Sequence, residues 1–167
     1  LHPSCSLFVS WIASVCWGAM DLSIVIVNWN TRDYLEQCLR SLANNVRANE
    51  RIDVETWVVD NASTDGSAEM VLELFPWAVL IRCTENVGFA RGNNQALGHV
   101  HGRYAVLLNS DTEVHPDALE TMVAFMDAHP AAGGCGPRLL NSDGSLQPSC
   151  HPLLTPEREF WRLMFLD

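Results

Sequence analysis

Lysine is absent from this chain of 167 residues, and all ten basic side chains are arginines. No residue can therefore form the Schiff base that pyridoxal-phosphate enzymes and other lysine-dependent catalysts require. A Walker A phosphate loop is excluded because its pattern ends in Gly-Lys. A flavodoxin-like signalling domain built around Asp60 would also lack the lysine of a phospho-receiver site.

Basic charge is scarce as well, since 10 arginines stand against 20 acidic residues and the formal net charge is −10. A protein that binds nucleic acid needs a basic face to neutralise phosphates, so we expect no nucleic-acid partner. An anionic ligand would need a local arginine or a bridging cation. With 48% hydrophobic and only 18% charged residues, the chain can bury the core of one domain.

The sequence also lacks the patterns of several metal and cofactor sites. None of its six cysteines forms a CxxC pair and no HExxH occurs, which argues against structural zinc and a disulfide framework. Cys38 and Cys83 fall in apolar periodic stretches and are predicted to be small buried hydrophobes. No GxGxxG follows the first predicted strand, which argues against an NAD-type oxidoreductase.

Residues 1–19 contain no charged side chain, and Met20 follows them. The apolar part, 7–19, is shorter than the roughly 20 residues of a membrane span, and it has no basic stretch typical of a signal peptide. We expect Met20 to be the natural start, and a weak hydrophobic anchor is the alternative. No strand is expected before Leu22.

From Leu22 onward, strand-like and helix-like patterns alternate. Buried β-branched strands are predicted at 22–27, 54–59, 78–81 and 104–108. Helices with one apolar stripe follow each of them: one capped by Thr31, one that ends before Pro76, one over 89–100, and one with Pro116 in its first turn. A turn at 141–144 is predicted to join two short strands, and a last helix is predicted over 156–166. This order predicts an α/β fold, a mostly parallel sheet with helices on both faces.

Polar residues follow all four predicted strands. In parallel sheets, ligands bind outside the carboxyl ends of the strands. These ends carry Asn28, Trp29 and Asn30, then Asp60 and Asn61, then Glu85 and Asn86, and finally Asn109 and Asp111. The alternative is that they are ordinary turn and capping residues, because Asp and Asn favour turns.

Four strings in this order resemble a known family: SIVIVNWN (23–30), VVDNASTDGS (58–67), ENVGFARGNNQAL (85–97) and LLNSDTEV (107–114). Residues 21–148 resemble the donor-binding half of inverting nucleotide-sugar glycosyltransferases of family two, which have the GT-A fold, a Rossmann-like nucleotide-binding domain. The bacterial rhamnosyltransferase-like branch is the most similar. The resemblance implies a nucleotide-sugar-binding domain over 20–150. It also implies an incomplete acceptor-side segment over 151–167, and it makes 1–19 a non-domain extension.

The resemblance implies a UDP- or dTDP-type sugar donor. The corner formed by residues 27–30 would line the pyrimidine and ribose together with Asp60, and Val27, Asn28 and Asn30 are its named contacts. An aspartate suits uracil or thymine because N3–H needs an acceptor. Arg91, one turn into a helix that opens after Gly88, is placed for phosphate oxygens. The alternatives are an Asx-turn role for Asp60 and a solvated surface position for Arg91. The remaining implied contacts are Asn86, Asn94, Asn109 and Ser110, although Asn94 and its neighbour Asn93 could instead pack or cap.

Asn109-Ser110-Asp111 occupies the place of the DXD motif of the family. The resemblance implies Mg²⁺ or Mn²⁺ bridging protein carboxylate and diphosphate. Asn109 replaces the first acid, so Asp111 is the expected metal ligand. His115, just before Pro116, is interpreted as a residue that leads into a helix and not as a ligand.

The resemblance further implies inverting, metal-assisted transfer of a sugar, with rhamnose one candidate, to a saccharide or lipid-linked acceptor in cell-surface polysaccharide synthesis. The protein would then be cytoplasmic and peripheral at the inner face of the plasma membrane. The catalytic general base is unknown: it is expected beyond Asp167, and Asp143, Glu157 and Glu159 are not favoured. A nucleotide-sugar-binding module without transfer activity is the alternative function.

Overall fold

A five-stranded sheet forms the centre of the structure, a computed structural model that describes residues 11–13, 20–48 and 51–149. The strand order is β1-β5-β2-β3-β4. The four strands β2 to β5 run parallel, whereas β1 pairs antiparallel with β5. The bounds are β1 Trp11–Ala13, β2 Met20–Asn28, β3 Val54–Asp60, β4 Val79–Arg82 and β5 Gly102–Asn109.

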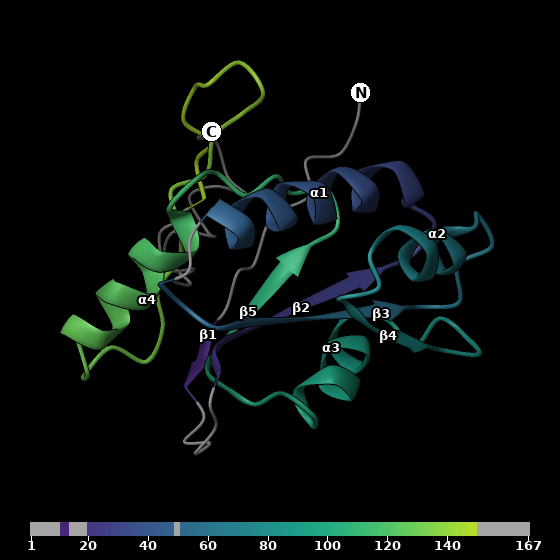
Figure 1. The fold of residues 1–167 in the computed structure, drawn as a ribbon, viewed down its shortest axis with the longest axis horizontal. Helices are drawn as coiled ribbons and strands as arrows, with labels where there is room; N and C mark the ends of the chain where they lie inside the picture. The colour runs from purple at the N-terminus through teal and green to yellow at the C-terminus, as the bar shows by residue number, and fades with distance from the viewer. Residues whose placement is uncertain (1–10, 14–19, 49–50, 150–167) are drawn as a thin grey trace, which may run out of the picture. The chain divides into compact units, whose positions relative to one another are not determined.

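Helices cover both faces of this sheet (Figure 1). They are α1 Arg32–Ala48, α2 Ser67–Leu74, α3 Phe89–Leu97 and α4 Ala118–Ala128. In Figure 1, α1 and α2 lie on one side of the sheet and α3 lies on the other. The predicted fold class, an α/β fold with a mostly parallel sheet, is therefore confirmed.

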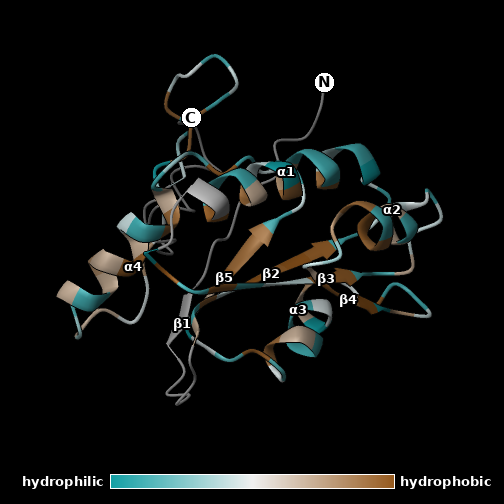
Figure 2. Cartoon of the chain, viewed as in Figure 1, coloured by the Kyte–Doolittle hydropathy of each residue, from teal (hydrophilic) through white to brown (hydrophobic). Residues whose placement is uncertain are grey.

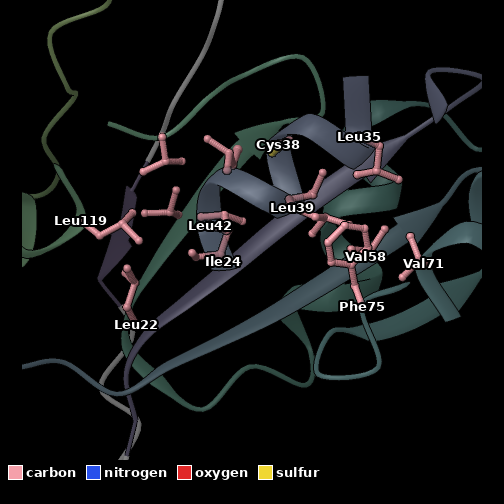
Figure 3. Packing of buried hydrophobic residues seen from close by; sticks show 14 of the residues in the cluster. Leu22, Ile24, Leu35, Cys38, Leu39, Leu42, Val58, Val71, Phe75 and Leu119 are labelled. Carbon is pink, nitrogen blue, oxygen red and sulfur yellow. The ribbon is translucent and has the colours of Figure 1, made fainter. Parts of the chain in front are cut away.

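Two apolar cores result from the alternation of side chains along the strands. Ile24 and Val58 face the first core with Leu35, Leu39 and Leu42 of α1, as Figure 3 shows. The other members of this core include residues of α2 and α4. The second core lies on the α3 side and contains Val25, Val59, Ala96 and Leu107. Figure 2 shows the strands as the most hydrophobic elements, which fits burial on both faces.

The chain divides into two compact units, residues 7–137 and residues 1–6 together with 138–167. In the second unit, the described residues form a turn closed by one antiparallel bridge between Leu140 and Leu146. The predicted joining turn is thus present, with a single bridge in place of two strands. The helix predicted over 156–166 lies outside the described residues.

Several local predictions were wrong. The strand β1 was not predicted, since no strand was expected before Leu22. Pro116 lies ahead of α4, not in its first turn, because Asp117 adopts a left-handed conformation (φ 62°) and α4 begins at Ala118. The third helix, predicted over 89–100, ends at Leu97. Beyond it, the N–H of His99 donates to the carbonyl of Ala96 (2.8 Å). Cys83 is half-buried, not buried like Cys38.

None of the helices within the described ranges is both long and apolar enough to cross a membrane.

Candidate functional site

The polar strand ends do meet at one edge of the sheet. Asn28, the last residue of β2, is the direct partner of Asp60, the last residue of β3. On the other side of β2, Val27 pairs with Asn109 at the end of β5. Asp60 in turn pairs with Arg82 at the end of β4. The loops that follow these strands therefore start side by side, as the sequence predicted.

Side-chain hydrogen bonds join the loops after β2, β3 and β5. Asn28 is fully buried; its Nδ2 donates to Oγ of Ser63 (3.2 Å), and its Oδ1 accepts from the Thr31 hydroxyl (2.6 Å). Thr31 Oγ1 also lies 2.9 Å from Oγ of Ser110. Asn28 and Ser110, both predicted to contact a ligand, thus have a scaffolding task. Their contact with a ligand stays a prediction.

Asn30, in the loop after β2, also bonds to the loop after β3. Its backbone is left-handed (φ 53°), which asparagine tolerates better than most residues. Its N–H donates to Oγ of Ser63 (3.0 Å), and its Oδ1 accepts from the N–H of Thr64 (2.8 Å). Between Asn28 and Asn30, the indole of Trp29 is 56% exposed. Trp29 lies within the predicted corner but was not named as a contact, although a large exposed aromatic beside a polar corner is a signal for ligand stacking.

The first turn of α1 is capped from another loop. Thr31 was predicted to cap this helix, but its hydroxyl is used by Asn28 and Ser110. Instead, Asp65 Oδ2 accepts the N–H of Arg32 (2.9 Å), while Oδ1 accepts the Ser67 hydroxyl. Burial alone would raise the pKa of Asp65, but these hydrogen bonds outweigh it and hold that pKa below its usual value. The loop after β3 is thereby fixed to the start of α1.

The loop before α3 is tied to β3 by Asn61, which the site prediction omitted. Asn61 is buried; its Nδ2 donates to Oδ1 of Asn86 (2.8 Å), and its Oδ1 accepts the N–H of Val87 (2.9 Å). The same oxygen of Asn86 accepts from the N–H of Gly88 (2.9 Å). Gly88 has φ 81°, a conformation that suits glycine. The signal for Asn61 was its place directly after the last residue of a buried strand.

Asp60 has one of the buried side-chain atoms that lack a hydrogen-bond partner among the described residues. Only 3% of it is exposed, and its Oδ2 accepts the N–H of Ser63 (3.1 Å), the turn role considered from sequence. Its other oxygen, Oδ1, is buried and has no partner among the described residues. A buried acceptor without a donor is costly, and native structures keep few of them. The contact of Asp60 with a ligand stays a prediction, and its free acceptor is compatible with it.

The start of α3 offers positive charge. Arg91 is exposed, and its side chain forms no hydrogen bond or ion pair with any residue that the structure describes. It lies in the first turn of the helix, where unpaired backbone N–H groups also favour anions. Asn94 is exposed, whereas Asn93 is buried and donates to the carbonyl of Phe89 (2.9 Å).

Val27 supports this helix and does not form a free wall of the site. A Cβ added at Gly92 would lie only 3.0 Å from Cγ1 of Val27, so α3 sits directly on β2 at this point. Val27 also packs against the core on the α3 side. Its side chain is therefore occupied by packing, and the prediction that it lines a pyrimidine gains no support.

The loop after β5 carries the expected metal ligand. Asp111 and Glu113 are exposed, and the carbonyl of Asn109 faces the Cys38 thiol at 3.8 Å. Burial, with the Asp111 and Glu113 charges adding to it, raises the pKa of Cys38 to about 12. In the described part of the chain, no three His, Cys, Asp or Glu side chains cluster closely enough to hold a metal alone. One unpaired carboxylate does fit Mg²⁺, which is often held by one or two carboxylates plus substrate phosphates.

Comparison with known proteins gives a consistent result. The family model described as "Glycosyl transferase family 2" matches residues 23–163. N-acetylglucosaminyl-diphospho-decaprenol L-rhamnosyltransferase of Mycobacterium tuberculosis is 27% identical over 143 residues, which are 79% of this chain and 45% of that protein. The chain thus spans less than half the length of this curated relative.

Two solved structures have similar folds. Staphylococcus aureus TarS 1-349 in complex with UDP-GlcNAc matches with a TM-score of 0.59 and 26% identity, over 66% of this chain and 32% of that one. The mannosyltransferase PcManGT of Pyrobaculum calidifontis, in complex with GDP-Man and Mn²⁺, matches with a TM-score of 0.55 and 27% identity. That match covers 68% of this chain and 36% of the mannosyltransferase chain.

Proposed function

Because this chain belongs to glycosyl transferase family 2, we propose that its described residues form the donor-binding part of a sugar-transferring enzyme. The donor is a UDP- or dTDP-linked sugar bound at the carboxyl edge of β2, β3 and β5. The observation that carries this proposal is the buried Oδ1 of Asp60, which has no partner among the described residues.

Uracil and thymine fit that oxygen. Both bases present N3–H as a donor, and the ionised carboxylate is an acceptor only. A bond from N3–H would satisfy Oδ1 while Oδ2 keeps its bond to the N–H of Ser63 (3.1 Å). The exposed indole of Trp29, next to the Asp60 partner Asn28, can stack on the face of the base. The complex of TarS with UDP-GlcNAc supports a uridine donor.

Groups on two sides of this sheet edge would bind the diphosphate. Arg91 and the amino end of α3 supply positive charge and N–H donors from one side. Asp111 would hold Mg²⁺ or Mn²⁺ from the other, and such an ion supplies charge that stabilises the departing diphosphate. The Mn²⁺ in the PcManGT complex supports the use of a divalent metal. Since the chain carries a net charge of −10, an anionic ligand needs such local positive charge.

The acceptor is a saccharide or lipid-linked saccharide, and a nearby carboxylate must take its proton for inverting transfer. We assign that base to no described residue: Asp143 lies in the turn of the second unit, where its Oδ1 accepts the N–H of Ser145 (2.9 Å). Glu157 and Glu159 lie outside the described residues. A lipid-linked acceptor would place the protein at the inner face of the plasma membrane, and the relative from M. tuberculosis, by its name, supports such an acceptor and rhamnose as the sugar.

Calorimetric titration of the full chain with UDP, dTDP, CDP, GDP and ADP in Mg²⁺ tests the proposal. UDP and dTDP should bind, and Asp60→Asn should weaken them by roughly 5- to 150-fold, the equivalent of about 1–3 kcal/mol. The control is Glu73→Gln on the exposed end of α2, which removes the same charge and should leave affinity unchanged. Equal binding of all five nucleotides, or unchanged UDP affinity in Asp60→Asn, would contradict the proposal.

A further inference from the structure

An open hollow lies on the α3 side of the sheet, where α3 packs against β2 and β3. Its lining consists of Trp57 from β3, Ile81 from β4, Gln95 from α3 and His99 just beyond that helix. Its volume is about 370 Å³, within the range of roughly 300–1,000 Å³ that small-molecule sites occupy. Ile81 is half-buried, and its strand β4 is the last strand of the sheet.

The lining offers flat apolar surface. The rings of Trp57 and His99 are nearly parallel, with an interplanar angle of 20° and 5.9 Å between their centroids. Ile81 adds an aliphatic side chain. A ligand with a broad C–H face can pack against such rings and bury apolar area.

The polar groups of the hollow are an amide and an imidazole, with a thiol beside them. The Cys83 thiol donates to Oε1 of Gln95 (3.3 Å), and burial raises the pKa of this thiol, so it stays protonated at neutral pH. With Oε1 occupied, the amide nitrogen of Gln95 remains available as a donor. The ring nitrogens of His99 have no hydrogen-bond partner in the part of the chain that is described. The lining contains no arginine and no carboxylate, so a phosphate or another charged group would lack a counter-charge.

We propose that this hollow binds a neutral sugar ring. A pyranose has an apolar C–H face for Trp57 and Ile81 and hydroxyl groups for Gln95 and His99. The site is separate from the proposed nucleotide site but adjacent to it, since the N–H of Cys83 donates to the carbonyl of Asp60 (2.8 Å). The ring belongs to a saccharide that stays bound during sugar transfer. This inference rests on the proposed function and extends it beyond donor binding.

Nitrogen-15 NMR of the full chain tests this assignment with methyl α-L-rhamnopyranoside, methyl N-acetyl-β-D-glucosaminide and a neutral trisaccharide. The indole N–H signal of Trp57 and the amide signals of Gln95 should shift saturably, with a dissociation constant of roughly 1–10 mM for a single ring. The indole signals of Trp29 and Trp77 should not move. Tighter binding of the trisaccharide would assign the site to a chain of sugars, and equal affinity would assign it to one terminal ring.

Matched variants separate binding in the hollow from non-specific shifts. Gln95→Leu and His99→Leu should each weaken binding by about tenfold, which corresponds to roughly 1.4 kcal/mol. His129→Leu is the control, because His129 stacks on Phe125 of α4 (4.2 Å between ring centroids), on a helix that contributes nothing to the hollow. The absence of saturable shifts at about 100 mM sugar, or unchanged affinity in both hollow variants, would overturn the inference.

A competition experiment distinguishes failure here from failure of the proposed function. Saturating UDP and the variant Asp60→Asn should both leave sugar binding unchanged. If UDP displaces the sugar, the two sites are one and the inference is wrong. If the sugar binds but UDP does not, the result supports sugar binding in the hollow and contradicts the proposed nucleotide site.

Discussion

The side-chain amides of Asn61 and Asn86 form a hydrogen bond, in which Nδ2 of Asn61 donates to Oδ1 of Asn86 (2.8 Å). This bond joins the loop after β3 to the loop before α3. Because Asn61 is buried and also accepts the N–H of Val87, both ends of its amide are used. The two loops that would hold a base and a diphosphate are therefore fixed to each other before any ligand arrives.

Asn61→Asp should break this connection. The change keeps the shape of the side chain but replaces the donor with a second acceptor that faces Oδ1 of Asn86 in a buried place. We expect a loss of about 1–3 kcal/mol in the free energy of unfolding, measured by urea denaturation. The control Asn44→Asp lies at an exposed position of α1 and should change stability by less than about 0.5 kcal/mol. Equal effects of the two variants would show that the Asn61 amide does not join the loops.

Gly92→Ala should destabilise the protein although alanine is the better helix former. The new Cβ would lie 3.0 and 3.2 Å from the two γ-methyl groups of Val27, and a valine in a strand has little freedom to turn away. We expect a loss of about 1–3 kcal/mol, seen in the midpoint of urea unfolding.

Two companion variants check that cause. Gly98→Ala meets only backbone oxygens at 3.9 and 4.0 Å and has φ −71°, so it should stabilise by about 0.4–1 kcal/mol. In a Val27→Ala background, Gly92→Ala should no longer destabilise. A loss of the same size in both backgrounds would mean that Val27 is not the obstacle.

Arg103 should give the protein part of its stability above acidic pH. It binds Asp21 (2.7 Å) and Asp127 (2.8 Å), and these hydrogen bonds hold the pKa of both carboxyl groups below the usual value. The stabilisation is complete above the unfolded pKa of about 3.9 and is lost as the pH falls from there through the lower folded pKa of each carboxyl group.

The variant Arg103→Gln should therefore unfold more easily at about pH 7, by less than about 1 kcal/mol for each exposed pair, and the difference from the parent should shrink as the pH falls through the lowered pKa values of the two carboxyl groups. The control Arg138→Gln changes an exposed arginine and should leave the stability unchanged at each pH. Thermal unfolding curves across this pH range make the comparison. A difference between parent and Arg103→Gln that stays constant with pH would rule out the two carboxylates as the cause.

Asp111 should link nucleotide affinity to divalent metal. In the parent chain, removal of Mg²⁺ with a chelator should weaken UDP binding by about tenfold or more. In Asp111→Asn, binding should be weak with or without Mg²⁺, because the unpaired carboxylate is gone. Glu73→Gln, which removes a distant charge, should keep the metal response. Titration calorimetry would disprove the role of Asp111 if that variant responded to Mg²⁺ as the parent does.

The sequence was sufficient for the features that depend on local pattern. The β-branched run before Asn28 predicted a buried strand, and the position of Asp60 after the next strand placed it at the same edge. What the sequence could not show depends on contacts between distant residues. Asp65 replaces Thr31 as the cap of α1 because the loop after β3 folds over the helix start, and no pattern near Thr31 contains that contact.

The same reason explains why the sequence did not show the packing contacts of two predicted site residues. Val27 was predicted to line a ligand, but Gly92, 65 positions later in the chain, brings α3 onto it. For Asn28, the sequence did not show that Ser63 and Thr31 use both ends of its amide. Side-chain contacts of this kind depend on how helices and loops pack together. The place of a residue at the sheet edge, in contrast, follows from the strand pattern.

Titration calorimetry with UDP and N3-methyl-UDP tests the role of Asp60 most directly. Methylation removes only the N3–H donor, so the parent chain should bind N3-methyl-UDP at least about tenfold more weakly than UDP. In Asp60→Ala, both ligands should bind with equal, weakened affinity, because the acceptor is gone. If the parent chain binds UDP and N3-methyl-UDP equally well, the unpartnered oxygen of Asp60 does not receive the base, and the proposed donor site is wrong.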